Sequence, residues 1–348
     1  SCRAYLLKLK RNCTFLIFYF VNLLGILMKN SEKLIFIDYL KVFSMLYIVG
    51  YWHVFDYTDF LPRNLYPISE KITLIALGLF TLISGFLNGK SVMTSPGIKD
   101  FYVKRLVRIY PLYLVAVILF FVYKQNDGLT SLKSLFLVSM LHGPAPRTLW
   151  FITMIMLFYL TTPFLVRLAK NLKNYILFTG LTMVLMTILM VVFKTIDIRL
   201  ILYFPCFFVG VYSAIFDMEN SLFNIKNAVV SLIIALILYM INTDLWTIEK
   251  LKEIPFILSS SYLIFVLSYR KRDFFTRTSL ILFLSYSSYA MYLFHRPIYI
   301  TMKAFYFPEA GIHQLLYLLG FCLLLVTLVS WSLQQVGDKL YVAAKNWL

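Results

Sequence analysis

The sequence predicts an all-α protein, a polytopic membrane helix bundle of about ten transmembrane helices with both termini in the cytoplasm. Of its 348 residues, 61% are hydrophobic and 14% are charged, whereas a soluble domain carries about 25% charged residues. The apolar residues form repeated stretches close to the ~20 residues that a helix needs to span a bilayer. The composition excludes an ordinary soluble fold. The net charge of +17 indicates basic loops that orient the helices, rather than a nucleic-acid partner.

The expected spans follow one another at short intervals, with boundaries good to about 2–4 residues. They cover 34–56, 71–89, 108–124, 149–167, 175–193, 200–216, 227–242, 254–269, 279–303 and 312–335. If Met28 is cytoplasmic, the loops on its side hold the larger share of Lys and Arg, above all at 90–108 and 270–277. This asymmetry favours two cytoplasmic termini.

The first 28 residues differ from the rest. Basic residues precede a short apolar run at 13–27, and Met28 is the first methionine of the sequence. We expect 1–28 to be an upstream extension or an N-terminal apolar segment, and 29–348 to be one membrane domain. The four cysteines show no paired spacing, so we expect neither a disulfide framework nor a metal site.

The first span carries three ionisable residues, Asp38, Lys41 and His53. Ionisable groups at membrane depth usually face the bundle interior or a water-filled cavity. Asp38 and Lys41 either form an ion pair at the inner mouth or anchor the helix at the headgroup level. His53 follows Asp38 by fifteen residues, roughly 22 Å along a helix, and therefore lies past the bilayer centre. Because neutral imidazole is a suitable base near pH 7, His53 is the candidate catalytic residue.

A second group of charges precedes the third span. Arg105 and Arg108 share one helix face at a spacing of three, and Tyr110 and Pro111 follow. One interpretation is an anchor that obeys the positive-inside rule. The other is a phosphate site at the cytoplasmic mouth, because guanidinium groups bind phosphate in a bidentate manner.

Two polar or aromatic groups lie in later spans. Trp150 opens the fourth span, where Trp usually belongs to the interfacial belt. Tyr292 and His295 share a face of the ninth span, on which several Ser and Tyr also occur. A single His near a helix end is more often structural, but these neighbours favour a polar lining. We therefore take Trp150, Tyr292 and His295 as candidate substrate-binding residues.

Six motifs occur in order from Leu34 to about Leu333. They are Ile37-Asp38-Tyr39-Leu40-Lys41 running to His53, Ser84-Gly85-Phe86, Arg105-x-x-Arg108-Ile109-Tyr110-Pro111, Leu149-Trp150-Phe151, Phe207-Phe208-Val209-Gly210, and Ser288-Tyr289-Ala290-Met291-Tyr292-Leu293-Phe294-His295. Each motif is weak alone, but the ordered set resembles the acyltransferase-3 family of bacterial integral-membrane acyltransferases.

The resemblance implies a ten-helix membrane acyltransferase domain at 29–348, in the bacterial inner membrane. It implies transfer of an acyl group, in this family often acetyl, from acyl-CoA to a hydroxyl of a sugar in a surface polysaccharide or its lipid-linked precursor. The expected partners are acyl-CoA, a sugar or glycolipid acceptor and the lipid bilayer, with no metal. By position, His53 matches the essential histidine of the family, and Arg105 and Arg108 match its donor-binding pair, which Lys41 would assist.

The sequence departs from the family pattern at Lys41. The family usually has Arg there, and Lys lacks the planar fork. The interval to His53 is twelve residues instead of eleven, which turns the histidine about 120° from the face of Lys41 on a regular helix. A local bulge at Gly50 would restore the facing.

Two other classes of function remain open at this stage. A transporter or flippase for a lipid-linked sugar would also have about ten spans and a basic mouth. It would need acids deep in several spans, whereas Asp38 is essentially the only acid predicted within one. A non-catalytic assembly or sensor protein would have no use for a buried His53.

Overall fold

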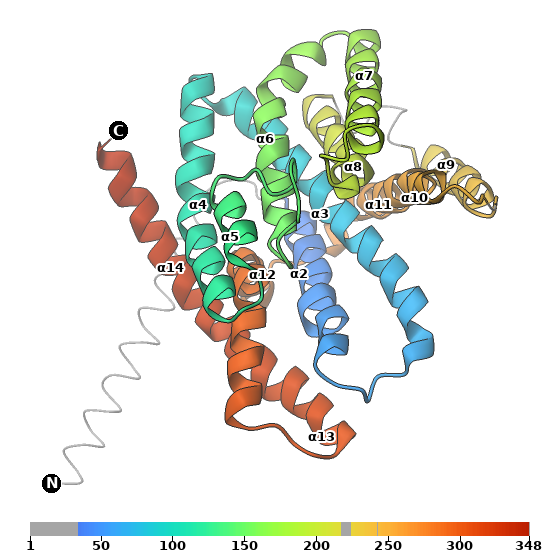
Figure 1. The fold of residues 1–348 in the computed structure, drawn as a ribbon. Coiled ribbons are helices and arrows are strands. Elements are labelled where there is room, and N and C mark those ends of the chain that lie inside the picture. Colours follow the sequence, from blue (N-terminus) through green and yellow to red (C-terminus); the bar gives the residue numbers. More distant parts are fainter. Residues whose placement is uncertain (1–33, 217–223, 242, 348) are drawn as a thin grey trace, which may run out of the picture.

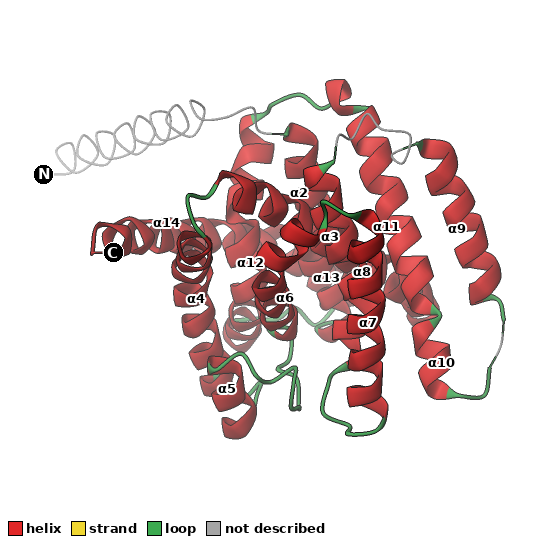
Figure 2. Cartoon of the chain, turned by 90° about the horizontal axis from the view of Figure 1, so that it is seen from above, coloured by secondary structure: helices red, strands yellow, loops and turns green. Residues whose placement is uncertain are grey.

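The computed structural model describes residues 34–216, 224–241 and 243–347. Within these ranges it contains helices and loops and no strand (Figure 2), so the all-α prediction is confirmed. The predicted extension at 1–28 lies outside the described residues. The helical elements, seen in Figure 1, are α2 (Ile35–Gly50), η1 (Trp52–Asp56), η2 (Arg63–Leu65), α3 (Tyr66–Thr94), α4 (Ile98–Val122), α5 (Gly128–Leu135), α6 (Trp150–Leu168), α7 (Leu172–Val191), α8 (Ile198–Ile215), α9 (Ile225–Tyr239), α10 (Trp246–Leu251), α11 (Glu253–Arg270), η4 (Arg272–Phe274), α12 (Ser279–Phe305), α13 (Gly311–Leu316), the π-helical η5 (Tyr317–Cys322) and α14 (Leu323–Trp347).

Among the described residues, eight helical segments are long and apolar enough to cross a membrane. The protein is therefore a polytopic helical membrane bundle. Two of the ten expected spans fall outside this set. The first is α9, an apolar helix of 15 residues. The second is α12, which has 27 residues but a more polar composition. The presence of both termini in the cytoplasm stays a prediction.

Alternating helix directions give the central bundle two distinct ends. Helices α2, α4 and α12 begin at one end, and α3 and α6 run back towards it. We call it the basic end, because Lys41, Lys90 and Arg105 lie in this half of the bundle. The opposite end, where η1 and the start of α6 lie, is called the histidine end. Polar side chains cap several helices; for example, Asp197 accepts a hydrogen bond from the Arg199 backbone at the start of α8.

Helices α3 and α8 cross in backbone contact at two glycines. A Cβ atom at Gly85 would lie 2.2 Å from the carbonyl oxygen of Phe207, and one at Gly210 would lie 2.0 Å from that of Leu82. Small residues permit such close approach in membrane bundles. Two of the six sequence motifs, around Gly85 and around Gly210, therefore form the two sides of one helix crossing. This crossing fixes α3, whose other face lines the site.

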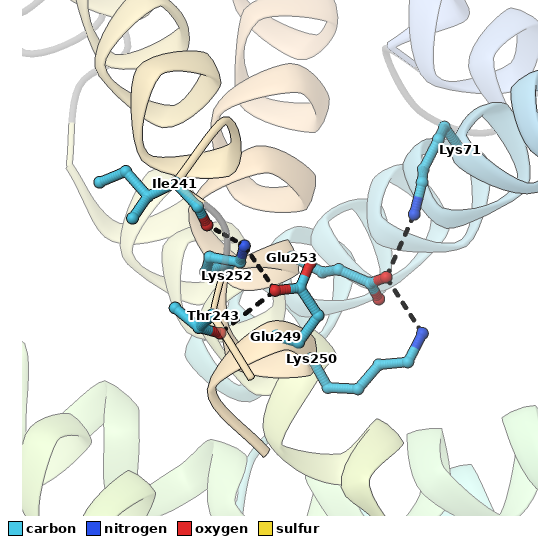
Figure 3. A network of polar contacts seen from close by, with 7 residues as sticks. All are labelled: Lys71, Ile241, Thr243, Glu249, Lys250, Lys252 and Glu253. Atoms are coloured by element: carbon cyan, nitrogen blue, oxygen red, sulfur yellow. Dashed lines mark hydrogen bonds and ion pairs between the residues drawn. The ribbon is translucent and has the colours of Figure 1, made fainter. Parts of the chain in front are cut away.

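Helix α9 lies at the periphery, with α11 between it and the rest of the bundle (Figures 1 and 2). At the histidine end, Glu253 of α11 is buried and pairs with Lys71 and with Lys250, each at 3.2 Å (Figure 3). Beside it, Lys252 pairs with Glu249 at 2.6 Å and also contacts the Ile241 carbonyl. This ionic network ties α3 and the α9–α10 connection to the start of α11.

Candidate active site

His53 lies in an irregular segment that follows the first helix. α2 ends at Gly50, and His53 belongs to the 3-10 turn η1. The expectation of a regular helix from Asp38 to His53 is therefore wrong, and the break falls at Gly50, where a local bulge was predicted. There is little space around Gly50, because a Cβ atom at this position would lie 3.1 Å from the Leu323 side chain. The direction in which the His53 side chain points is therefore set by this 3-10 turn, and the regular rotation per residue of an α-helix does not give it.

The turn brings His53 against His295 of α12. The two imidazole rings stack with centroids 4.6 Å apart and an interplanar angle of 11°. His53 is 8% exposed and His295 is fully buried. The two histidines are 242 residues apart in the sequence, and each was a candidate for a separate reason. The structure brings them together as one pair.

Contacts from α12 hold η1 in place on both sides of the stack. Arg296 donates a hydrogen bond of 2.6 Å to a carboxylate oxygen of Asp56. Lys303 donates one of 2.8 Å to the Tyr57 carbonyl, and the Tyr299 hydroxyl donates one of 3.3 Å to the Val49 carbonyl. These bonds tie the chain before and after His53 to one rigid helix, so α12 determines where the His53 ring lies.

A cavity of about 530 Å³ opens among α2, α3, α4, α6 and α12. In the half near the basic end it is lined by the cations Lys41, Lys90, Arg105 and Arg108. Deeper, where the helices approach the histidine end, its wall consists of Ile48, Leu77, Phe80, Phe151 and Tyr292. The cavity is therefore cationic at one end and apolar with a single phenol at the other. The residues predicted to bind a donor, Arg105, Arg108 and Lys41, all line it.

Tyr292 lines the apolar end of the cavity and is the lining residue that contacts His295. Neither histidine lines the cavity, and the Tyr292 ring lies 6.1 Å from the His295 ring, between centroids. The Tyr292 hydroxyl donates a hydrogen bond of 2.7 Å to the Thr148 carbonyl. The cavity that the arginine pair lines therefore does not extend to His53. Tyr292, predicted to bind substrate, lines the cavity and lies beside the histidine pair.

Asp38 positions Lys41 at the cationic half of the cavity. Lys41 Nζ lies 2.9 Å from Asp38 Oδ1, and the Ser285 hydroxyl donates to the same oxygen at 2.6 Å. Both Asp38 and Ser285 are buried. The carboxylate therefore bridges α2 and α12 and holds the ammonium group against the cavity.

Arg105 has hydrogen-bonding capacity to spare. Its Nη2 donates a long bond of 3.5 Å to the Leu87 carbonyl, and its guanidinium lies 5.8 Å from the centroid of the Tyr159 ring. Its Nε is buried and has no hydrogen-bond partner in the structure. Lys90, which the sequence places at the start of the basic loop 90–108, lies over the Phe86 ring at 4.8 Å and adds a fourth cation to the cavity.

Trp150 lies away from the cavity. Its ring stacks on Tyr203, with centroids 6.0 Å apart, and carries the Arg199 guanidinium at 4.4 Å. It therefore packs at the start of α6 instead of lining the cavity.

Sequence reasoning missed Arg296 and Asp56. Arg296 is buried and also contacts the Thr148 hydroxyl. A charge inside the predicted span 279–303 was the signal that could have identified it. A second omission is Glu253, which is buried. The interpretation of Asp38 as essentially the only acid within a span is therefore wrong, because α11 begins one residue before the predicted boundary.

In the described part of the chain, no three His, Cys, Asp or Glu residues gather in an arrangement that could hold a metal ion. The fold and site together define a multi-pass membrane protein with a cavity that is cationic at one end and a histidine pair beyond the other. The chain belongs to the acyltransferase-3 family, whose sequence profile, described as an acyltransferase domain, matches residues 34–334. No curated protein and no solved structure matches the chain. The protein is accordingly a membrane acyltransferase.

Proposed function

We propose that the protein moves an acetyl group from acetyl-CoA to a hydroxyl of a sugar, in a cell-surface polysaccharide or its lipid-linked precursor, in the bacterial inner membrane. The observation that carries the proposal is the polarity of the cavity: four cations and the single carboxylate of Asp38 line one end, and mostly apolar side chains line the other. Acyl-CoA has the same polarity, with phosphates at one end and a thioester at the other. The family membership supports acyl transfer.

The donor fits the cavity in one direction. Its phosphates would meet Arg105 and Arg108, whose guanidinium groups match phosphate geometry, while Lys41 and Lys90 add point charges. The uncharged pantetheine arm would pass between Ile83 and Ile155 into the apolar half. The acyl group would then lie against Tyr292, one aromatic ring away from the histidines.

The transfer itself would occur at the histidine pair, after Tyr292 turns aside. The acceptor oxygen attacks the thioester carbonyl carbon while an imidazole nitrogen takes the hydroxyl proton. The carbon–sulfur bond breaks, and the CoA thiolate takes up that proton to leave as a thiol. His53 remains the candidate catalytic residue, now as one member of a pair with His295.

Among the described residues, the two buried acids give no support to the alternative of a flippase driven by ion coupling. Asp38 is paired with Lys41, and Glu253 is paired with two lysines. A carboxylate that carries ions or protons through a bundle needs to exchange partners along a path, and both acids are held by fixed bonds. We therefore keep the acyltransferase as the function.

Donor binding tests the cavity assignment. Titration of the purified protein with acetyl-CoA is expected to give a dissociation constant that Arg105→Gln raises about 10-fold or more, because a hydrogen bond to a charged group contributes about 1.5–3 kcal/mol. Arg63→Gln is the matched control, since Arg63 is exposed and pairs with Asp59 at the histidine end. Equal affinities for the wild type and Arg105→Gln would contradict the donor site.

The transfer is tested with membranes, labelled acetyl-CoA and a panel of glycans. His53→Ala is expected to abolish label transfer while donor affinity stays at the wild-type value. Full transfer by His53→Ala would rule out a role for this residue in the chemistry. Loss of the surface glycan, and not of its acetyl groups, on removal of the gene would favour the flippase.

A further inference from the structure

The ring of His295 is held in one tautomer by its own helix. Its Nδ1 lies 3.1 Å from the Met291 carbonyl oxygen and 2.9 Å from that of Tyr292. Carbonyl oxygens only accept hydrogen bonds, so Nδ1 must carry the hydrogen. In the neutral ring the other nitrogen, Nε2, is then an unprotonated acceptor. The backbone of α12 therefore leaves one basic atom on this side chain.

That basic atom has no partner. His295 Nε2 is buried and unpaired in the structure, as is Nδ1 of the neighbouring His53. A buried polar atom without a hydrogen bond is costly for a fold. The residue is fully buried, one helical turn beyond Tyr292, at the point where the cavity ends. An unpaired acceptor nitrogen at the end of the cavity is suited to accept a hydrogen bond from a ligand hydroxyl.

The surroundings of Nε2 favour a neutral ring that becomes charged only during reaction. The Arg296 guanidinium, next in the chain and buried, opposes a positive charge on the resting imidazole. The two carbonyls at Nδ1 would stabilise the imidazolium once it forms, because they accept its N–H more strongly. In a Ser-His-Asp triad, the carboxylate that accepts the Nδ1–H hydrogen bond orients the catalytic histidine and stabilises its imidazolium in the same way.

From this geometry we propose that Nε2 of His295 is the atom that takes the proton of the acceptor hydroxyl. The proposal rests on the proposed acyltransferase function and deepens it. The O–H bond breaks as the oxygen bonds to the thioester carbon, the proton moves to Nε2, and the departing thiolate later removes it. His53 stacks on His295. Because a neutral imidazole has one protonated nitrogen, His53 has a single N–H, which donates a hydrogen bond to the thioester carbonyl oxygen.

The tautomer is tested without any activity measurement. The sequence has only four histidines, so 15N spectra of the full-length, histidine-labelled protein can resolve each ring. We expect one ring with a protonated Nδ1 and an unprotonated Nε2, whose signals disappear in His295→Asn. Assignment of the opposite tautomer to His295 would overturn the proposal, whatever the enzyme does.

The chemistry is tested with two substitutions that differ in which nitrogen they imitate. His295→Asn keeps an amide N–H near the helix carbonyls but has nothing at Nε2, and His295→Gln places a non-basic amide near Nε2. Acetyl-CoA serves as donor, and n-octyl glucoside and water serve as acceptor probes. Both variants are expected to lose about 10²–10⁴-fold in transfer, the range for general base catalysis, with donor affinity unchanged.

His142→Asn is the matched control, because His142 is exposed, and it should transfer at the wild-type rate. Transfer by His295→Asn within about threefold of the wild type would overturn the proposal. If acetyl-CoA does not bind the wild-type protein, the proposed function fails, and the proton-acceptor role of His295 fails with it, although the tautomer of the ring is still read from the spectra. If donor binds normally and only the His295 result is negative, the role of His295 fails and the proposed function stands.

Discussion

Replacement of Gly210 by alanine is expected to separate α3 from α8 and to destabilise the whole site. The new Cβ atom would lie 2.0 Å from the Leu82 carbonyl oxygen and 2.9 Å from the Phe86 nitrogen. Ordinary carbon–oxygen contacts are about 3.3 Å or longer, so the helices must move apart by more than about 1 Å. The obstructing atoms belong to the backbone of a helix, which has no rotamer to change.

Overpacking of this kind costs about 1–3 kcal/mol, and occasionally more. We expect the upper end of that range at Gly210. An unfolding entropy of about 2.1 cal/mol/K per residue corresponds to about 1.6 °C for each kcal/mol in a domain of about 300 residues, so the midpoint of thermal unfolding in detergent should fall by roughly 5 °C. Donor affinity should fall as well, because the other face of α3 lines the cavity.

Gly180→Ala on α7 provides the matched control. Nothing lies within 4 Å of a Cβ atom at that position, and Ala is favoured over Gly inside a helix by about 0.5–1 kcal/mol. Its unfolding midpoint should be unchanged or slightly higher. Equal midpoints for the Gly210→Ala and Gly180→Ala proteins would refute the reasoning that the α3–α8 crossing requires glycine.

Three further substitutions test the charged groups. Asp38→Asn leaves the Lys41 ammonium without its carboxylate and should lower the unfolding free energy by about 1–3 kcal/mol, measured in detergent; an unchanged value would show that the pair contributes nothing. Glu253→Gln should destabilise by a similar amount, reduced by solvent screening at its two partly exposed lysines, and unfolding by urea checks this. Arg296→Met should leave donor binding intact but slow transfer, because the Asp56 tie that holds η1 is lost; wild-type transfer rates would exclude this positioning role.

The sequence was sufficient for the fold class and for three of the four cations in the cationic half of the cavity, Lys90 being the exception. Long apolar stretches predict spanning helices, and ionisable residues within or beside them mark the faces that turn inward. Lys41, Arg105 and Arg108 were identified in this way, and the structure places all three around one cavity.

The histidine pair could not be predicted, because its two members come from distant parts of the chain. Helical periodicity says which side of its own helix a residue occupies and nothing about the helix that packs there. It also assumes a regular helix, and α2 ends before His53. Nor could the sequence show that Trp150 packs against Tyr203 and Arg199 outside the cavity; its role in substrate binding stays a prediction.

The position of Tyr292 bears on how well the bundle prevents ion leakage across the membrane. A bundle that holds a water-accessible hollow halfway through a lipid layer risks a leak of protons and small ions. The Tyr292 phenol, hydrogen-bonded to the Thr148 carbonyl, lies at the apolar end of that hollow. Its bulk fills space beside the histidine pair, so a smaller side chain there would lengthen the hollow towards His295.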